Sequence, residues 1–223
     1  MSTHSRYVVG IDLGTTNSAL AYIDTAAIAK DELSLSLNAH EGQDGPGLPR
    51  PQVLHLPQVV APGQVEPRPV LPSFLYLSAP REFPGGALDL PWSAGRSYVV
   101  GEFARQHGVQ VPMRLCSSAK SWLSYGGADR TAPILPPPGP PGSGPEEADL
   151  PRLSPVDVAA RYLMHLRDAW DEAMAADSGS AQLSEQEVLL TVPASFDAVA
   201  RELTVRAAHS AGLTRVTLLE EPQ

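Results

Sequence analysis

The 223-residue sequence contains a single cysteine, Cys116, so it cannot form an internal disulfide bond. A lone thiol is typical of a protein from a reducing compartment, and we expect Cys116 to be a buried core residue. The sequence also lacks long apolar runs. The N-terminal residues contain no stretch of signal-peptide length, and nothing later approaches a membrane span. These absences predict a cytoplasmic protein that makes no use of a membrane.

Positive charge is also scarce. Aspartate and glutamate number 25 against 16 lysine and arginine residues, which gives a net charge of −9 and argues against nucleic-acid binding. The only lysines are Lys30 and Lys120. A compact ammonium group is not equivalent to a guanidinium, so this usage points weakly to Lys120 as a functional residue. The six histidines lack ligand spacing and have no cysteine pair, so we expect no metal site built from side chains.

The most informative stretch is residues 9–18, VGIDLGTTNS. It predicts a strand at residues 7–11, a tight turn at residues 14–16 and a second strand at residues 18–23. Glycine lets a backbone come close to a ligand, and successive amides with two hydroxyls form a cradle for anionic oxygens. Asp12, at the end of the first strand, would hold a hydrated cation beside them. The stretch therefore predicts a site for the phosphate tail of a nucleotide with its Mg²⁺.

An ordinary β-hairpin with polar turn residues is an alternative interpretation of the same stretch. A Walker loop is not, because no lysine follows the glycine and the next element is a strand rather than a helix.

Further along the chain we expect a third strand near residues 33–37, and irregular strands and loops at residues 40–72. Strands are predicted at residues 71–77 and 98–101, followed by a short helix at residues 102–107.

A helix carrying Lys120 is predicted at residues 114–125. The nine prolines of residues 131–155 predict an exposed loop without a packed interior.

The second half of the sequence has clearer patterns. Ser154, Pro155 and Asp157 form a helix-start signature, and Trp170 lies on the apolar stripe that follows. A strand at residues 188–192 and a final strand at residues 215–219 enclose a second helix, which ends at a glycine. Its predicted apolar stripe consists of Val199, Leu203, Ala207 and Ala211, and the glycine is Gly212. Together these elements predict an α/β fold with helices packed on a mixed sheet.

Two segments at opposite ends of the chain resemble the heat shock protein 70 (DnaK-type) chaperones. Residues 11–18, IDLGTTNS, are similar to the first phosphate motif of that family, and residues 190–197, LTVPASFD, are similar to its TVPAYF segment. Arg201, residues 211–213 and residues 218–222 follow in the order and spacing of the same block. Residues 71–73, 100–101 and 119–120 match more loosely, also in order.

The resemblance implies the first lobe of an actin-like (ribonuclease H-like) ATPase, a mixed sheet with packed helices and an irregular Pro/Gly-rich outer subdomain. Residues 1–38 and 154–223 would form the inner subdomain, residues 39–130 the outer subdomain with the Lys120 helix, and residues 131–153 a Pro-rich exposed loop. Residues 40–149 are longer and richer in proline than the usual outer subdomain, which implies a divergent bacterial member.

The resemblance also implies the ligands. Gly14, Thr15, Thr16 and Asn17 would bind the phosphates of ATP or ADP, and Asp12 would hold Mg²⁺ through water molecules.

Four more residues have implied roles. Lys120 would neutralise the γ-phosphate and position the attacking water, and Glu221, preferred over Glu220 because it directly precedes the proline, would orient that water. Pro193 and Arg201 are similar to the switch pair that passes the nucleotide state to the substrate domain. The alternatives are a solvated helix lysine for Lys120 and a surface acid at a strand end for Glu221. For Pro193 and Arg201 they are a strand-ending proline and a solvated helix arginine.

The implied function is the N-terminal half of the ATP-binding and ATP-hydrolysing domain of a chaperone. Its partners in a full-length protein would be unfolded client polypeptides and co-chaperones, and the lobe alone would be inactive or very weak. Two alternatives stay open: an actin-like metabolite kinase, and a filament or scaffold protein with a structural nucleotide. The block at residues 191–196 and the Glu-Glu-Pro run favour the chaperone, and no acid can be placed as the kinase base.

Overall fold

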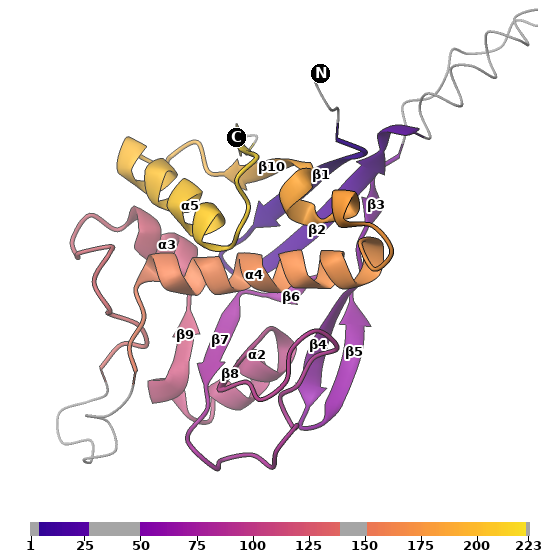
Figure 1. The fold of residues 1–223 in the computed structure, drawn as a ribbon. Helices are drawn as coiled ribbons and strands as arrows, with labels where there is room; N and C mark the ends of the chain where they lie inside the picture. Colours follow the sequence, from indigo (N-terminus) through magenta and orange to yellow (C-terminus); the bar gives the residue numbers. More distant parts are fainter. Residues whose placement is uncertain (1–4, 27–49, 139–150, 222–223) are drawn as a thin grey trace, which may run out of the picture.

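The computed structural model describes residues 5–26, 50–138 and 151–221. Figure 1 shows one long helix, α4 (Pro155–Met174), crossing the front of the molecule. Most of the largest sheet and helix α5 (Ala198–Ser210) lie above α4 in this view, and a second group of strands lies below it. The third strand expected at residues 33–37 falls outside the described residues.

The largest sheet is mixed, as the sequence predicts. Its strand order is β11-β10-β1-β2-β3, with β6 also paired to β2. Strands β1, β10 and β11 run parallel to one another, and β2 is antiparallel to β1. Its strands are β1 (Tyr7–Leu13), β2 (Asn17–Asp24), β3 (Gln52–Val53), β6 (Leu71–Pro72), β10 (Glu187–Val192) and β11 (Val216–Glu220).

Buried and more exposed residues alternate along β1, and this alternation explains how the sheet packs. Val9, Ile11 and Leu13 are buried, while the residues between them are half-buried or exposed. Successive side chains of a strand point to opposite faces, so one face of β1 enters the core. That core includes Trp170 of α4, which is fully buried as predicted.

Local sequence signals set the helix boundaries. Helix α4 begins at a capping box in which Ser154 and Asp157 satisfy each other's backbone amides. Helix α5 begins after its N-cap Asp197 and ends before Gly212, whose φ of 81° suits glycine. The predicted apolar stripe of α5 is wrong at Val199, which is 52% exposed, because Ala200 occupies the buried position of the first turn.

The second group of strands forms two small sheets around a short helix. One sheet is a β4–β5 hairpin and the other has the order β8-β7-β9. The elements are β4 (Leu56–Ala61), β5 (Gln64–Arg68), β7 (Phe74–Leu77), β8 (Tyr98–Val100), β9 (Leu115–Ser117) and α2 (Glu102–Gly108). Short 3-10 helices are η1 (Pro112–Arg114), η3 (Gly179–Ala181) and η4 (Leu183–Glu185). Residues 52–68 are therefore more regular than the irregular region expected from the sequence.

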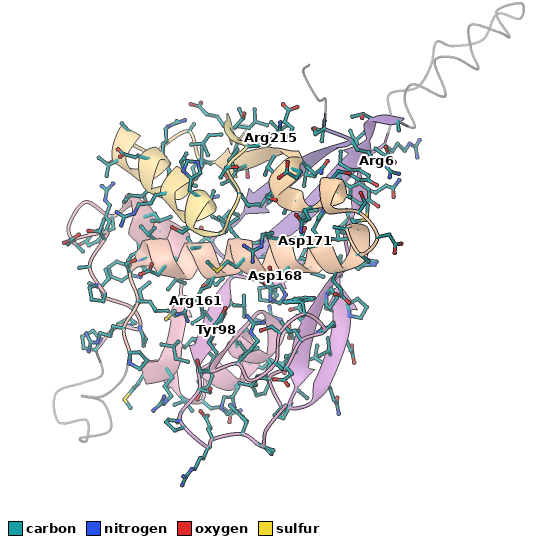
Figure 2. All side chains as sticks on the ribbon, in the orientation of Figure 1. Arg6, Tyr98, Arg161, Asp168, Asp171 and Arg215 are labelled. Carbon is teal, nitrogen blue, oxygen red and sulfur yellow. The ribbon has the colours of Figure 1, made fainter. Side chains whose placement is uncertain are left out.

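Helix α4 joins the two groups. Arg161 of α4 lies over the ring of Tyr98 in β8, with its guanidinium carbon 4.4 Å from the ring centroid (Figure 2). One hydrophobic cluster runs from Val9 of β1 to Leu75 of β7. The two groups of strands therefore share a core.

The predicted helix at residues 114–125 is only partly correct. Leu115–Ser117 forms β9 on the edge of β7, and the helix α3 covers only Ala119–Ser124. Ser118 between them has a φ of 56°, so the chain changes direction there. Pairing with β7 satisfies the backbone of the first residues, which overrides their helical pattern.

The predicted strand at residues 71–77 is divided in two. β6 pairs with β2 of the large sheet, whereas β7 pairs with β8 and β9. The chain changes sheets at Ser73, which lies between them and is buried.

The loop predicted at residues 131–155 is not exposed throughout. Leu135 is fully buried, and its backbone exchanges hydrogen bonds with that of Leu153 at 2.9 and 2.6 Å. The expectation of a segment without a packed interior is wrong at these two residues, because an apolar side chain next to the α4 N-terminus can join the core. Residues 139–150 lie outside the described residues.

Within the described parts of the chain, the helices are too short or too polar to span a lipid bilayer.

Candidate functional site

The turn between β1 and β2 is built around Gly14. A Cβ atom at this position would lie 2.0 Å from the carbonyl oxygen of Asn17, so glycine is required by the close approach of the backbone. Thr15, Thr16 and Asn17 are all exposed. The turn therefore presents two hydroxyls and an amide side chain to solvent from a backbone that is tightly folded on itself.

The buried Ser73 fixes this turn through two hydrogen bonds. The sequence analysis assigned it no role. Its amide donates to the carbonyl of Thr16 at 2.8 Å, and its hydroxyl donates to the carbonyl of Gly14 at 2.8 Å. The signal that could have found it is a small polar residue inside the apolar run of residues 71–77. A buried hydroxyl in such a run needs partners, and here the partners belong to the turn.

Asp12 lies near the end of β1, one residue before the strand finishes. Its carboxylate is exposed and accepts a hydrogen bond from the hydroxyl of Thr191 at 3.1 Å, from the neighbouring parallel strand β10. An ionised carboxylate has about four acceptor positions. Asp12 therefore keeps the capacity to accept hydrogen bonds from the water shell of a cation.

Lys120 and Glu221 are brought together from distant parts of the sequence. The Lys120 side chain is 8% exposed, and its Nζ donates to Oε1 of Glu221 at 2.6 Å. Glu221 is positioned by its own backbone amide, which donates to the carbonyl of Val192 at 2.9 Å. The alternative of a solvated helix lysine does not describe Lys120, because a buried ammonium needs a compensating partner and has one here.

Glu220 has a different partner. Its carboxylate accepts from the guanidinium of Arg201 at 2.7 Å. Arg201 Nε also donates to the carbonyl of Phe196 at 3.1 Å, and the Phe196 amide donates to the carbonyl of Pro193 at 3.0 Å. Arg201 thus joins the turn that begins at Pro193 to the end of β11, so it is not a solvated helix arginine.

A second ion pair was not visible in the sequence. Arg130 forms two hydrogen bonds of 2.9 Å with the carboxylate of Asp197, and its Nε donates to the carbonyl of Tyr125 at 3.3 Å. The Arg130 guanidinium lowers the pKa of Asp197 to about 2. The pair connects the end of α3, which carries Lys120, to the N-cap of α5. No local signal predicts a contact between residues 67 positions apart.

The candidate residues gather at one edge of the large sheet. β1, β10 and β11 are parallel, so their carboxyl ends lie on the same side. Asp12 lies at the end of β1, Pro193 directly after β10 and Glu221 directly after β11. Lys120 joins this edge through its contact with Glu221. In α/β sheets the carboxyl ends of the strands are the usual place for a bound ligand.

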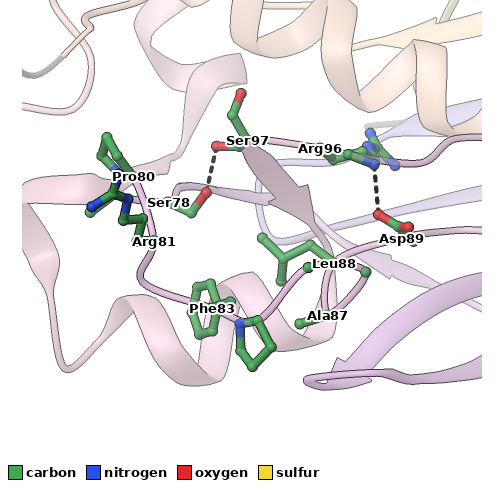
Figure 3. A pocket seen from close by; sticks show the side chains of 14 residues that line it. Ser78, Pro80, Arg81, Phe83, Ala87, Leu88, Asp89, Arg96 and Ser97 are labelled. Atoms are coloured by element: carbon green, nitrogen blue, oxygen red, sulfur yellow. Dashed lines mark hydrogen bonds between the residues drawn. The ribbon is translucent and has the colours of Figure 1, made fainter.

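A cavity of about 420 Å³ lies elsewhere, among loops of the second group of strands (Figure 3). It is lined by residues 78–81, 83–89 and 95–97, and Ser78 donates to the carbonyl of Ser97 at 2.9 Å across one side. None of the candidate residues lines this cavity.

The fold and the site define an α/β protein with a polar turn and a lysine–glutamate pair at the carboxyl edge of a mixed sheet. No protein-family model matches the chain. Similar curated proteins are an HscA chaperone homologue from Bordetella pertussis (31% identical), one from Azotobacter vinelandii (29%) and the HscA chaperone of Salmonella agona (28%). Each alignment covers 97% of this chain, and the chain spans 27% of the length of each relative. The chain belongs to the heat shock protein 70 type of chaperones, as a divergent member.

Proposed function

We propose that this chain is the N-terminal half of an ATP-binding and ATP-hydrolysing chaperone domain, with the actin-like (ribonuclease H-like) fold of that family. The observation that carries the proposal is that Asp12, the Gly14 turn and the Lys120–Glu221 pair all lie at the same edge of the large sheet. The similarity to HscA chaperones over 97% of the chain supports it.

The chemistry of this edge fits Mg²⁺ with ATP or ADP. Gly14, Thr15, Thr16 and Asn17 would bind the phosphates, because the tight turn exposes Thr15, Thr16 and Asn17 and offers hydroxyl and amide donors. The exposed carboxylate of Asp12 would hold the ion through water molecules, as hydrated Mg²⁺ prefers. The metal ion would supply charge neutralisation for the phosphate oxygens.

Lys120 would contribute a positive charge to the γ-phosphate and help to position the attacking water. Glu221 would orient that water through its carboxylate. Phosphoryl transfer needs charge neutralisation and positioning more than covalent chemistry, and both can come from such a pair. The Lys120 ammonium lies 2.6 Å from the Glu221 carboxylate, so both groups could contact the same water molecule.

Pro193 and Arg201 would form the switch that passes the nucleotide state to a substrate domain. Arg201 contacts Glu220, the residue next to Glu221, and this contact supports the proposal. A movement of Glu221 would shift Glu220 and, through the ion pair, Arg201.

The proposal includes a division of the chain. Residues 1–38 and 154–223 would be the inner subdomain, residues 39–130 the outer subdomain and residues 131–153 a Pro-rich loop. In the whole protein, unfolded client polypeptides and co-chaperones would be the partners, and the location would be the cytoplasm.

The proposal can be tested by following the γ-phosphate of labelled ATP with the natural full-length chain. Release as inorganic phosphate, stimulated by an unfolded polypeptide, is the expected result. Transfer to a small hydroxylated metabolite would favour the actin-like kinase instead. Assembly with Mg-ATP that depends on protein concentration, without phosphate release, would favour the filament or scaffold protein.

A further inference from the structure

Ser73 engages every hydrogen-bonding group that it has. It is 1% exposed and lies where the chain leaves β6 for β7. Its amide and its hydroxyl donate to the carbonyls of Thr16 and Gly14, both at 2.8 Å. The hydroxyl of Ser18 is 3.0 Å from that of Ser73. A serine has one hydroxyl proton, and that of Ser73 is given to Gly14, so Ser18 is the donor in this contact.

The two carbonyls held by Ser73 determine where the amides of the turn point. A peptide group is planar and trans, so its C=O and N–H are directed to opposite sides. With the carbonyl of Gly14 drawn toward Ser73, the amide of Thr15 is directed away from Ser73. The carbonyl of Thr16 has the same effect on the amide of Asn17. Ser73 therefore directs these two N–H groups away from its own buried position.

Tyr162 of α4 fixes Ser73 in turn. Its hydroxyl donates to the carbonyl of Ser73 at 2.9 Å and lies 3.4 Å from the carbonyl of Cys116 in β9. Burial raises the pKa of the Tyr162 phenol well above its ordinary value, so it stays a donor. The strand β9 leads directly to α3 and Lys120. One buried tyrosine thus contacts both the segment that holds the turn and the strand that precedes Lys120.

We propose that Ser73 is a positioning residue for the phosphate groups of the nucleotide, acting through the turn amides of Thr15 and Asn17. This inference rests on the proposed function. Ser73 does not touch the ligand. It holds the turn in the orientation that presents these amides. Ser73 is itself held by Tyr162, which also contacts the strand before Lys120.

The test compares ligands with and without phosphates. Affinities for Mg-ADP and for adenosine are measured by calorimetry on the natural full-length chain and on its Ser73→Ala variant. We expect about tenfold weaker binding of Mg-ADP, the effect of one hydrogen bond, with the adenosine affinity unchanged. A general loss of structure would weaken both ligands together, so the difference between them reports positioning.

Thr204→Val is the matched control. Thr204 is also 1% exposed, and its hydroxyl donates to the carbonyl of Ala200 at 2.8 Å, but it lies in α5 away from the turn. We expect the control to bind both ligands as the unmodified chain does. If Ser73→Ala fails to fold, Tyr162→Phe removes the hydroxyl that donates to the Ser73 carbonyl and lies 3.4 Å from the Cys116 carbonyl. This variant should weaken Mg-ADP binding about threefold, again without an effect on adenosine.

Equal Mg-ADP affinity in the unmodified chain and the Ser73 or Tyr162 variant would overturn the positioning role and leave the proposed function intact. An equal loss for adenosine and Mg-ADP would overturn it as well, because that is the signature of a structural role. If the unmodified chain binds neither ligand, the proposed function fails, and this inference fails with it.

Discussion

Lys120 donates a 2.6 Å hydrogen bond to Glu221, which lies 101 positions later in the sequence. The lysine comes from α3, and the glutamate directly follows β11. The pair forms because the Glu221 amide continues the pairing with β10 and sets the direction of the side chain. An ammonium group buried to this degree would be unfavourable without the carboxylate. Two residues of complementary charge are thus held at the sheet edge where Asp12 also lies.

Glu220 and Glu221 allow a comparison of neighbouring carboxylates. We expect Glu221→Gln to lower ATP turnover by the natural chain about 100-fold, because the group that orients the water is lost. Glu220→Gln should leave the basal rate nearly unchanged, because Glu220 contacts Arg201 instead of Lys120. Steady-state phosphate release measures both, and equal losses in the two variants would contradict the assignment.

Gly14 should not tolerate a side chain. In Gly14→Ala the new Cβ would meet the Asn17 carbonyl, so we expect a loss of roughly 2–4 kcal/mol in the free energy of unfolding and no measurable Mg-ADP binding. Gly179→Ala is the control, since a Cβ there has no atom within 4 Å. Urea denaturation and calorimetry check the two effects, and near-normal stability of Gly14→Ala would disprove the tight turn.

The Asp197 carboxyl should titrate near pH 2. Its pKa is lowered from 3.8, first by the hydrogen bond from Arg130 and then by that from the Ala200 amide. A pKa that is lowered in the folded state stabilises the fold at pH values above the ordinary pKa of the carboxyl. This contribution is lost as the pH falls toward 2. Arg130→Gln should move the titration toward 3.8. Carbon NMR of the carboxyl measures it, and a midpoint near 3.8 in the unmodified chain would rule out the ion pair in solution.

His165 should make the fold sensitive to mild acid. It is 1% exposed and its Nε2 donates to the carbonyl of Pro57 at 3.0 Å, while burial lowers its pKa to about 3. The unfolded chain takes up this proton near pH 6.5, so stability decreases as the pH falls below that value, by up to about 1 kcal/mol per pH unit.

Urea denaturation between pH 7 and pH 5 tests this effect. His165→Asn should have a flatter dependence of stability on pH than the unmodified chain. The exposed His209 provides the control, and His209→Asn should keep the original slope. Equal slopes in all three proteins would show that His165 is not held neutral in the fold.

The sequence predicted those parts of the fold that depend on neighbouring residues. The β1–β2 hairpin, the cap at Ser154 and the stop at Gly212 each follow from local chemistry that the structure contains. The burial of Cys116 is also confirmed.

The remainder depends on contacts between distant segments. The helix predicted from residue 114 gives way to β9, because an available edge on β7 satisfies the backbone better. Ser73 meets the turn 59 positions away, and Arg130 meets Asp197 across 67 positions. No periodicity or local motif encodes such pairs, so they become visible only when the sheets are assembled. The roles of the nucleotide-site residues stay predictions.

The most direct test of the account is ATP turnover and ATP binding by the Lys120→Ala variant of the natural full-length chain. Turnover should fall at least about 100-fold, while the Mg-ATP affinity stays within about threefold of the unmodified value. Arg68→Ala, which removes an exposed cation paired with Glu66, is the control and should change neither quantity. Normal turnover in Lys120→Ala, or no Mg-ATP binding by the unmodified chain, would contradict the account.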